Sequence, residues 1–122
     1  MLFFVYGTLK NGMKNSHILK KVQGELISEC CTLEKYPMFD LGNGFPYVQN
    51  KPGFGMKLDG ELYKVDEKYE AKLDYFEGVP TLYKKGKIKV DYSESEVNCY
   101  FIADELTDEE LKDAELFGNW VE

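Results

Sequence analysis

The sequence begins with a run of large apolar and aromatic residues, Leu2-Phe3-Phe4-Val5-Tyr6, which Gly7 ends. A short continuous apolar run of this kind predicts a buried strand, because a half-exposed strand would alternate apolar and polar side chains. Burying it requires a real hydrophobic core. Hydrophobic residues make up 43% and aromatic residues 15% of the 122 residues, which is typical of a folded globular domain. We expect one domain over residues 1–122.

Strand patterns dominate the rest of the chain. Apolar and polar residues alternate over residues 24–35, 55–65, 87–92 and 97–103. The last two segments flank the turn-like Ser93-Glu94-Ser95-Glu96, which predicts a hairpin.

Proline and glycine interrupt residues 36–55, between two of these predicted strands. We expect a long irregular loop there, with at most one short strand near Tyr47-Val48, and such loops often form the wall of a binding site. Short helices are predicted at Ser16–Lys21, between Asp66 and Gly78, and after the capping box that begins at Thr107. The predicted fold class is α+β, a small mixed β-barrel with a few short inserted helices.

The chain contains no arginine: its 15 basic residues are all lysine, against 22 acidic residues, for a formal net charge of −7. An acidic surface without arginine repels phosphate backbones, so nucleic acid is not an expected partner. The N-terminal apolar run is too short for a signal sequence or a membrane span. We expect a cytoplasmic protein that binds a small molecule and no membrane.

Histidine and cysteine are scarce. His17 is the only histidine, which excludes a zinc or iron site built from several histidines. A Ser-His-Asp or Cys-His nucleophile would have to use His17 itself. Cys30, Cys31 and Cys99 are odd in number and lack CxxC spacing, so we interpret them as buried apolar side chains in a reducing compartment.

The segment Tyr6-Gly7-Thr8-Leu9 is the first candidate site. A strand that ends in Tyr-Gly-Thr leaves consecutive backbone N–H groups unpaired at its tip, and glycine lets a ligand approach the main chain closely. Such groups bind anions. A strand–Gly–Thr turn without any ligand has the same pattern.

The second candidate is Glu77, within Asp74-Tyr75-Phe76-Glu77-Gly78-Val79-Pro80. Glu77 falls in the last turn of its predicted helix, where the macrodipole disfavours a negative charge, and its neighbours are apolar. Both effects raise the pKa of a carboxyl group, which suits a general base near neutral pH. The alternative is a solvated glutamate beside a helix-ending glycine.

Taken together, these segments resemble the γ-glutamylcyclotransferase superfamily, most closely its γ-glutamylamine cyclotransferase-like (AIG2-like) branch. The resemblance covers nearly the whole chain, and the order and spacing of its motifs make it specific. The motifs are Val5-Tyr6-Gly7-Thr8-Leu9-Lys10-Asn11-Gly12, Tyr36-Pro37-Met38, Leu73-Asp74-Tyr75-Phe76-Glu77-Gly78 and Gly118-Asn119-Trp120.

The resemblance implies a cofactor-free, metal-free cyclotransferase. Its substrate would be a γ-glutamylamine such as γ-glutamyl-ε-lysine, whose own α-amine closes a ring to give 5-oxoproline and the free amine. Glu77 would be the general acid and base, and the backbone amides of Gly7, Thr8 and Leu9 would hold the carboxylate and the developing oxyanion.

Other residues of the pattern have two interpretations each. Tyr6 could donate its hydroxyl to the ligand or simply pack, and Tyr83 could lie beside the site or belong to an aromatic core. Tyr100 is expected to line the same cavity. His17 is expected to brace the Tyr6–Leu9 loop rather than to catalyse.

Two departures from the family pattern bear on the ligand. Lys84-Lys85 stands where relatives often carry arginine, and Asn119 stands in place of aspartate in the terminal Gly-Asp-Trp. Without an arginine fork, a substrate carboxylate must be held by lysine or by main-chain amides.

Three alternatives remain open. The same chemistry could act on a γ-glutamyl dipeptide or on a γ-glutamyl-protected biosynthetic intermediate. The cavity could instead be a non-catalytic carboxylate-binding module, although a buried glutamate would oppose anion binding. Glycoside hydrolysis would need a second carboxylate such as Asp40, and the spacing does not support it.

Overall fold

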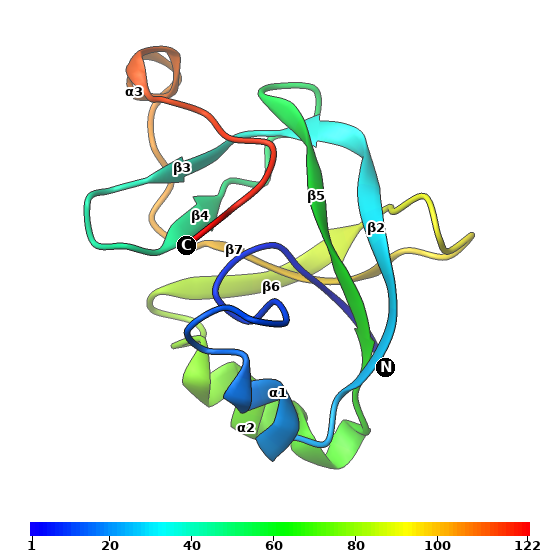
Figure 1. Cartoon of the computed structure of the whole chain (residues 1–122). Coiled ribbons are helices and arrows are strands. Elements are labelled where there is room, and N and C mark those ends of the chain that lie inside the picture. Colours follow the sequence, from blue (N-terminus) through cyan, green and yellow to red (C-terminus); the bar gives the residue numbers. More distant parts are fainter.

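The computed structural model describes residues 1–122 as a mixed sheet with short helices around it (Figure 1). The five strands lie in the order β2-β5-β1-β7-β6. Their bounds are Leu2–Val5 for β1, Glu25–Tyr36 for β2, Met56–Lys64 for β5, Tyr83–Ile88 for β6 and Val97–Ile102 for β7. The strand β1 pairs parallel with β7 and antiparallel with β5, and the remaining pairs are antiparallel.

The two edges of this sheet meet through the segment that follows β6. Thr32 of β2 forms an isolated bridge with Val90, and the N–H groups of Leu33 and Asp91 donate to the carbonyls of Lys89 and Cys31. These contacts close the sheet into a small barrel, since no long strand edge remains unpaired between β2 and β6. The predicted α+β class with a mixed barrel is confirmed.

The strand β1 is buried on both of its faces. Phe4 and Tyr6 belong to a cluster with side chains from every strand of the barrel, so this cluster fills the interior. Phe3 and Val5 point the opposite way, into a second cluster that the helices cover. The continuous apolar run at the start of the sequence therefore forms the strand that separates two hydrophobic cores.

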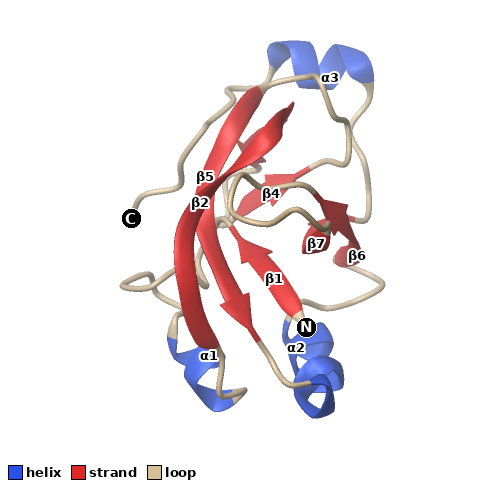
Figure 2. Cartoon of the chain, turned by 90° about the vertical axis from the view of Figure 1, so that its right-hand side faces the viewer, coloured by secondary structure: helices blue, strands red, loops and turns tan.

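The helices are short and lie at the two ends of the barrel (Figure 2). The helix α1 covers His17–Lys21, and the 3-10 turn η1 at Glu67–Tyr69 leads directly into α2 at Glu70–Phe76. The helix α3, Asp108–Asp113, begins with the predicted capping box between Thr107 and Glu110. None of these helices has the length and apolar character needed to cross a membrane.

The structure corrects the prediction for residues 36–55. This segment contains two short strands rather than at most one: β3 at Met38–Asp40 pairs antiparallel with β4 at Pro46–Val48. Met38 and Phe39 are both fully buried, so the strand carries no alternation that the sequence could reveal.

The hairpin before β7 is also displaced from its prediction. The strand β6 covers Tyr83–Ile88 rather than residues 87–92, although β7 lies where it was expected. Residues beyond Ile88 still alternate because Val90 continues inward to the bridge with Thr32. The alternation beyond Ile88 arises because this segment closes the barrel against β2, and not because it pairs with β7.

The cysteines are free, and two of them are buried as predicted, namely Cys30 and Cys99. Cys31 is an exception, because it is partly exposed and its thiol lies 2.9 Å from the Asp59 carboxylate. This hydrogen bond, with some burial, raises the pKa of Cys31 to about 11, so the thiol stays protonated near neutral pH.

We predict that Phe4→Ala lowers the free energy of unfolding by about 3–5 kcal/mol, because it empties the centre of the barrel interior. Phe4 is 1% exposed, whereas Phe45, the matched control, is 38% exposed. Phe45→Ala should change stability by less than about 1 kcal/mol. Urea unfolding of the two variants tests this, and equal losses would contradict the central position of β1.

Candidate functional site

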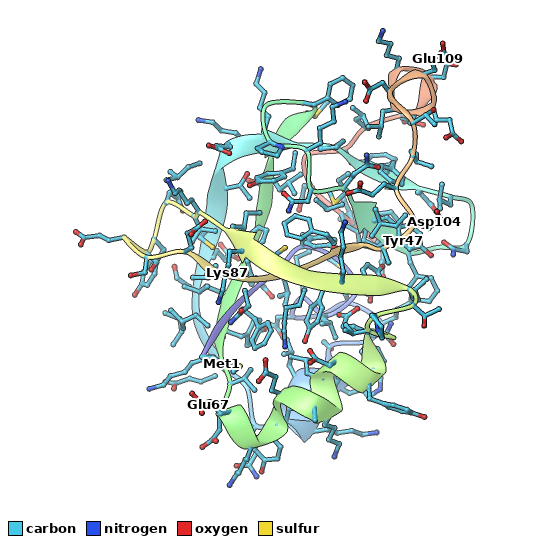
Figure 3. The ribbon with its side chains drawn as sticks, turned by 180° about the vertical axis from the view of Figure 1, so that it is seen from behind. Met1, Tyr47, Glu67, Lys87, Asp104 and Glu109 are labelled. Carbon is cyan, nitrogen blue, oxygen red and sulfur yellow. The ribbon has the colours of Figure 1, made fainter.

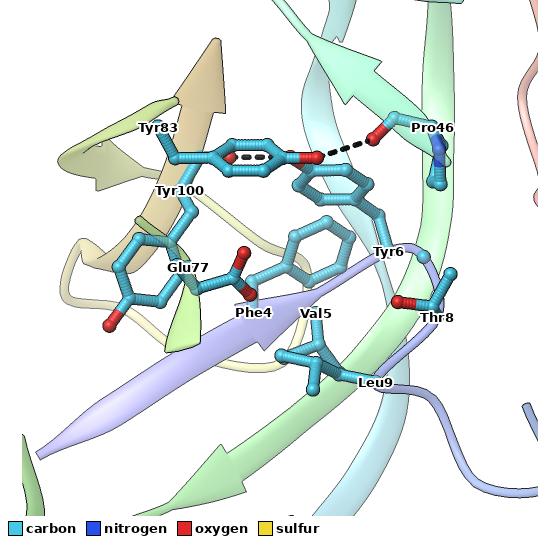
Figure 4. Close-up of a pocket in the computed structure, with 10 residues that line it drawn as sticks. Phe4, Val5, Tyr6, Thr8, Leu9, Pro46, Glu77, Tyr83 and Tyr100 are labelled. Atoms are coloured by element: carbon cyan, nitrogen blue, oxygen red, sulfur yellow. Dashed lines mark hydrogen bonds between the residues drawn. The ribbon is translucent and has the colours of Figure 1, made fainter. Parts of the chain in front are cut away.

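A cavity lies where β1 ends, and it brings the two sequence-predicted segments together (Figure 4). The space between its walls is about 340 Å³ when the open solvent at its mouth is counted, so it is a shallow, open cavity. The strand β1, the turn after it, β4, β6, β7 and the end of α2 all contribute to the wall. The lining residues are Phe4, Val5, Tyr6, Gly7, Thr8, Leu9, Pro46, Glu77, Tyr83 and Tyr100. Glu77 thus faces the Tyr6–Leu9 turn across one cavity.

The turn after β1 presents free main-chain donors. The backbone N–H groups of Gly7, Thr8 and Leu9 donate no hydrogen bond within the protein. The carbonyls of the turn are occupied instead: Gly7 O accepts from Lys10 N at 3.1 Å, and Thr8 O accepts from Asn15 N at 3.0 Å. Because the carbonyls are fixed, the amides are held in place as a site for negative charge.

Two contacts hold the Thr8 side chain and the backbone of Gly7. Asn15 donates from Nδ2 to Thr8 Oγ1 at 3.0 Å. A β-carbon at position 7 would lie 2.4 Å from Cγ of Pro46, so only glycine lets β4 approach the turn this closely. The wall of the cavity thus depends on Gly7 and Pro46 packing together.

The end of the chain braces the same turn through Lys10. The buried Lys10 donates from Nζ to Asn119 Oδ1 at 2.9 Å and to the Trp120 carbonyl at 2.7 Å. Burial lowers the pKa of Lys10, and nearby carboxylates oppose this effect. The motif Gly118-Asn119-Trp120 therefore lies behind the site, where it anchors the residue after Leu9, and it does not line the cavity.

Glu77 is the C-cap of α2, and its carboxylate points across the cavity toward the side that holds Tyr6 and Thr8 (Figure 4). No protein group donates a hydrogen bond to this carboxylate, and it retains contact with the cavity space. Burial raises the pKa of Glu77 from 4.5 to about 7, and the negative charge of Asp74 contributes further. The expected rise is confirmed, with burial as its main cause.

Three tyrosines present their rings to the cavity and use their hydroxyls elsewhere. Tyr6 donates to the Tyr100 carbonyl at 2.5 Å, and Tyr83 donates to the Pro46 carbonyl at 3.0 Å. Tyr100 donates to Asp74 Oδ1 at 2.6 Å, and its hydroxyl points away from the cavity (Figure 4). Burial raises the pKa of all three, which keeps them neutral. Tyr6 therefore packs and bonds within the protein.

The prediction for His17 is wrong. This residue is exposed at the start of α1 and makes no hydrogen bond. Asn15 braces the Tyr6–Leu9 loop instead. Sequence reasoning also missed Pro46, Phe4 and Val5 in the wall, although Pro46 belongs to the loop expected to form a binding wall. Asn15 carried no signal beyond its position two residues before His17.

This arrangement combines two chemical functions. The three unpaired N–H groups can stabilise a carboxylate or an oxyanion, and the carboxyl group opposite them can exchange a proton near neutral pH. Aromatic rings and Val5 line the space between them, which lowers the local dielectric constant and strengthens both effects. No group of three or more His, Cys, Asp or Glu side chains is arranged to hold a metal ion.

The fold agrees with what comparison with known proteins shows. The family described as "Gamma-glutamyl cyclotransferase, AIG2-like" matches residues 3–122, and the chain belongs to this family. The chain is similar to the gamma-glutamylaminecyclotransferase B of Danio rerio, with 38% identity over 109 residues, which are 83% of this chain and 57% of the relative.

The human gamma-glutamylaminecyclotransferase is also 38% identical, over 97 residues that are 76% of this chain and 63% of the human protein. This chain thus spans less than two-thirds of these relatives' length. The crystal structure of a mouse AIG2-like protein superposes with a TM-score of 0.83 at 26% identity. It covers 98% of this chain and 87% of the mouse chain, so the fold is shared.

The raised pKa of Glu77 predicts a pH-dependent cost of folding. A carboxyl group with a pKa of about 7 when folded and 4.5 when unfolded stabilises the fold fully below pH 4.5. That contribution is lost as the pH rises to about 7. Glu77→Gln, which cannot ionise, should gain about 2 kcal/mol of stability over the wild type between pH 5.5 and pH 8.5.

Urea unfolding at the two pH values measures this gain. The exposed Glu94 is the matched control, and Glu94→Gln should show no such dependence. An equal stability difference between Glu77→Gln and wild type at both pH values would show that the carboxyl group titrates normally.

Proposed function

We propose that this protein is a cyclotransferase that converts a γ-glutamylamine, such as γ-glutamyl-ε-lysine, to 5-oxoproline and the free amine. One observation carries the proposal: the Glu77 carboxylate, with its raised pKa, faces the three unpaired amides of Gly7, Thr8 and Leu9 across one cavity. The family to which the chain belongs supports the reaction class. The three free cysteines suit a cytoplasmic setting.

The proposed reaction begins with proton removal. The α-ammonium of the substrate is not nucleophilic, so the Glu77 carboxylate takes one proton from it. The resulting amine attacks the γ-carbonyl carbon and closes a five-membered ring, and the carbonyl oxygen becomes an oxyanion. The protonated Glu77 then returns its proton to the departing nitrogen as the C–N bond breaks. The ring nitrogen still carries a second proton, which Glu77 removes in turn and passes to the released amine, so one carboxyl group that cycles twice suffices.

Main-chain amides take the part that an arginine would otherwise play. The N–H groups of Gly7, Thr8 and Leu9 hold the substrate's carboxylate and help to stabilise the oxyanion. The rings of Tyr6, Tyr83 and Tyr100 bound the cavity, and they keep the glutamyl chain folded so that its amine lies near its own carbonyl. Ring closure within one held molecule has a large effective molarity, which supplies much of the rate.

Glu77→Gln should abolish most turnover. We expect 5-oxoproline release from γ-glutamyl-ε-lysine to fall by about 10²–10⁴-fold or more, since glutamine cannot shuttle a proton. The control Glu94→Gln should retain the wild-type rate. Full activity in Glu77→Gln would remove this residue from the mechanism. Ligand binding without turnover would instead favour a carboxylate-binding module.

A panel that varies only the leaving amine separates the substrates. It comprises γ-glutamylamines, γ-glutamyl dipeptides and γ-glutamyl-protected intermediates. For the best substrate, kcat/KM should fall about tenfold per pH unit below pH 7, because the base must be ionised in the free enzyme. A profile flat down to pH 5 would contradict the proposed base.

Gly7→Ala should damage binding more than folding. Its β-carbon would meet the Pro46 ring at 2.4 Å, so the turn and its amides must shift. We expect kcat/KM to fall by about 10²-fold, because small displacements of binding groups cost this much. Kinetics measured beside urea unfolding test the prediction. An unchanged kcat/KM in a folded variant would show that the amides do not contact the substrate.

A further inference from the structure

A charged group of residues lies between α2 and β6, and one of its members, Asp74, stands three residues before Glu77 in the sequence. In Figure 3 the helix α2 runs beneath β6, which places their side chains opposite one another. Lys85 of β6 donates from Nζ to Asp74 at 2.9 Å and 3.1 Å, and it also forms an ion pair with Glu70. One lysine thus serves two carboxylates of α2, which leaves this cluster with a net negative charge.

Asp74 links this cluster to the cavity wall through Tyr100. The Tyr100 hydroxyl donates to Asp74 Oδ1 at 2.6 Å. Its ring lines the cavity and stacks on Phe3, with 5.6 Å between ring centroids and 10° between planes. The position of the ring therefore depends on a carboxylate that Lys85 holds from the other side.

Asp74 also lies one helical turn before Glu77, so its charge acts on the Glu77 carboxyl group. The other titratable groups that face Glu77 are Tyr6 after β1, Tyr83 on β6, and Cys99 and Tyr100 on β7. Burial keeps all four neutral near pH 7. Asp74, with its partner Lys85, is the charged neighbour that remains.

We propose that Asp74 and Lys85 are positioning residues for Glu77: Asp74 holds Tyr100 in the cavity wall and places a negative charge one helical turn before Glu77, and Lys85 offsets that charge. The inference rests on the proposed function, because it concerns the same base. A lysine that only held α2 against β6 by ion pairs would stabilise the fold without affecting the titration of Glu77. A tuning role requires that removing the charge of Asp74 and removing the charge of Lys85 move the titration midpoint of Glu77 in opposite directions.

The test is a ¹³C NMR titration of the Glu77 carboxyl carbon, assigned by its loss in Glu77→Gln. Asp74→Asn removes a negative charge, so the midpoint should fall by roughly 0.5–1 pH unit. Lys85→Met leaves Asp74 and Glu70 uncompensated, so the midpoint should rise by a similar amount. The acidic limb of kcat/KM should move in the same two directions.

Matched controls come from the neighbouring ion pair of Lys84 and Glu105, which joins side chains that are 44% and 42% exposed. Lys84→Met and Glu105→Gln should leave the Glu77 midpoint unchanged, because solvent screens this pair. Lys85→Arg keeps the charge and should restore the wild-type midpoint. If Asp74→Asn does not fold, the difference in the Glu77 midpoint between Lys85→Met and Lys85→Arg still tests whether this charge acts on Glu77.

The two proposals fail separately. If no γ-glutamyl compound is turned over but the midpoints move oppositely, the charge tuning stands and the reaction is wrong. If the wild type is active and both variants leave the midpoint of Glu77 in place, or move it the same way, the tuning role is overturned.

Discussion

The burial of β1 on both faces is the constraint on which the rest of the structure depends. A strand with Phe4 and Tyr6 on one side and Phe3 and Val5 on the other needs two cores. The barrel supplies one, and the helices supply the other. Because pairing on both edges stops where β1 ends, the N–H groups of Gly7, Thr8 and Leu9 have no sheet partners, and these residues line the cavity. The proposed anion site thus lies directly where the central strand stops.

The opposite wall follows from the end of a helix. The helix α2 has only seven residues, and Leu73 is its one fully buried side chain. Its C-cap, Glu77, is buried among mostly apolar side chains, and no protein group donates a hydrogen bond to its carboxylate, which opposes ionisation. The free-energy cost of ionising this buried carboxyl group appears as the raised pKa of Glu77. In our proposal, Asp74 and Lys85 adjust the pKa of Glu77 further.

Much of the fold and the site was predictable, since the signals were local. The strand β1, the helix that ends before Gly78 and the capping box at Thr107 each depend on a few neighbouring residues. The errors concern long-range contacts. The strand β3 is buried on both faces and shows no alternation, and Val90 alternates because it bridges to Thr32, far away in the sequence. His17 and Asn15 could not be distinguished, because only packing decides which side chain reaches Thr8.

The chemical groups available to this protein follow from residue order alone: one glutamate among apolar neighbours, a strand end that leaves amides unpaired, and no arginine. These are properties of residue type and short spacing. The fold alone established that the two segments share one cavity, that the tyrosine hydroxyls bond elsewhere and that Lys85 pairs with Asp74. These contacts join residues that lie far apart in the chain. They therefore form only when the barrel closes and α2 packs on β6.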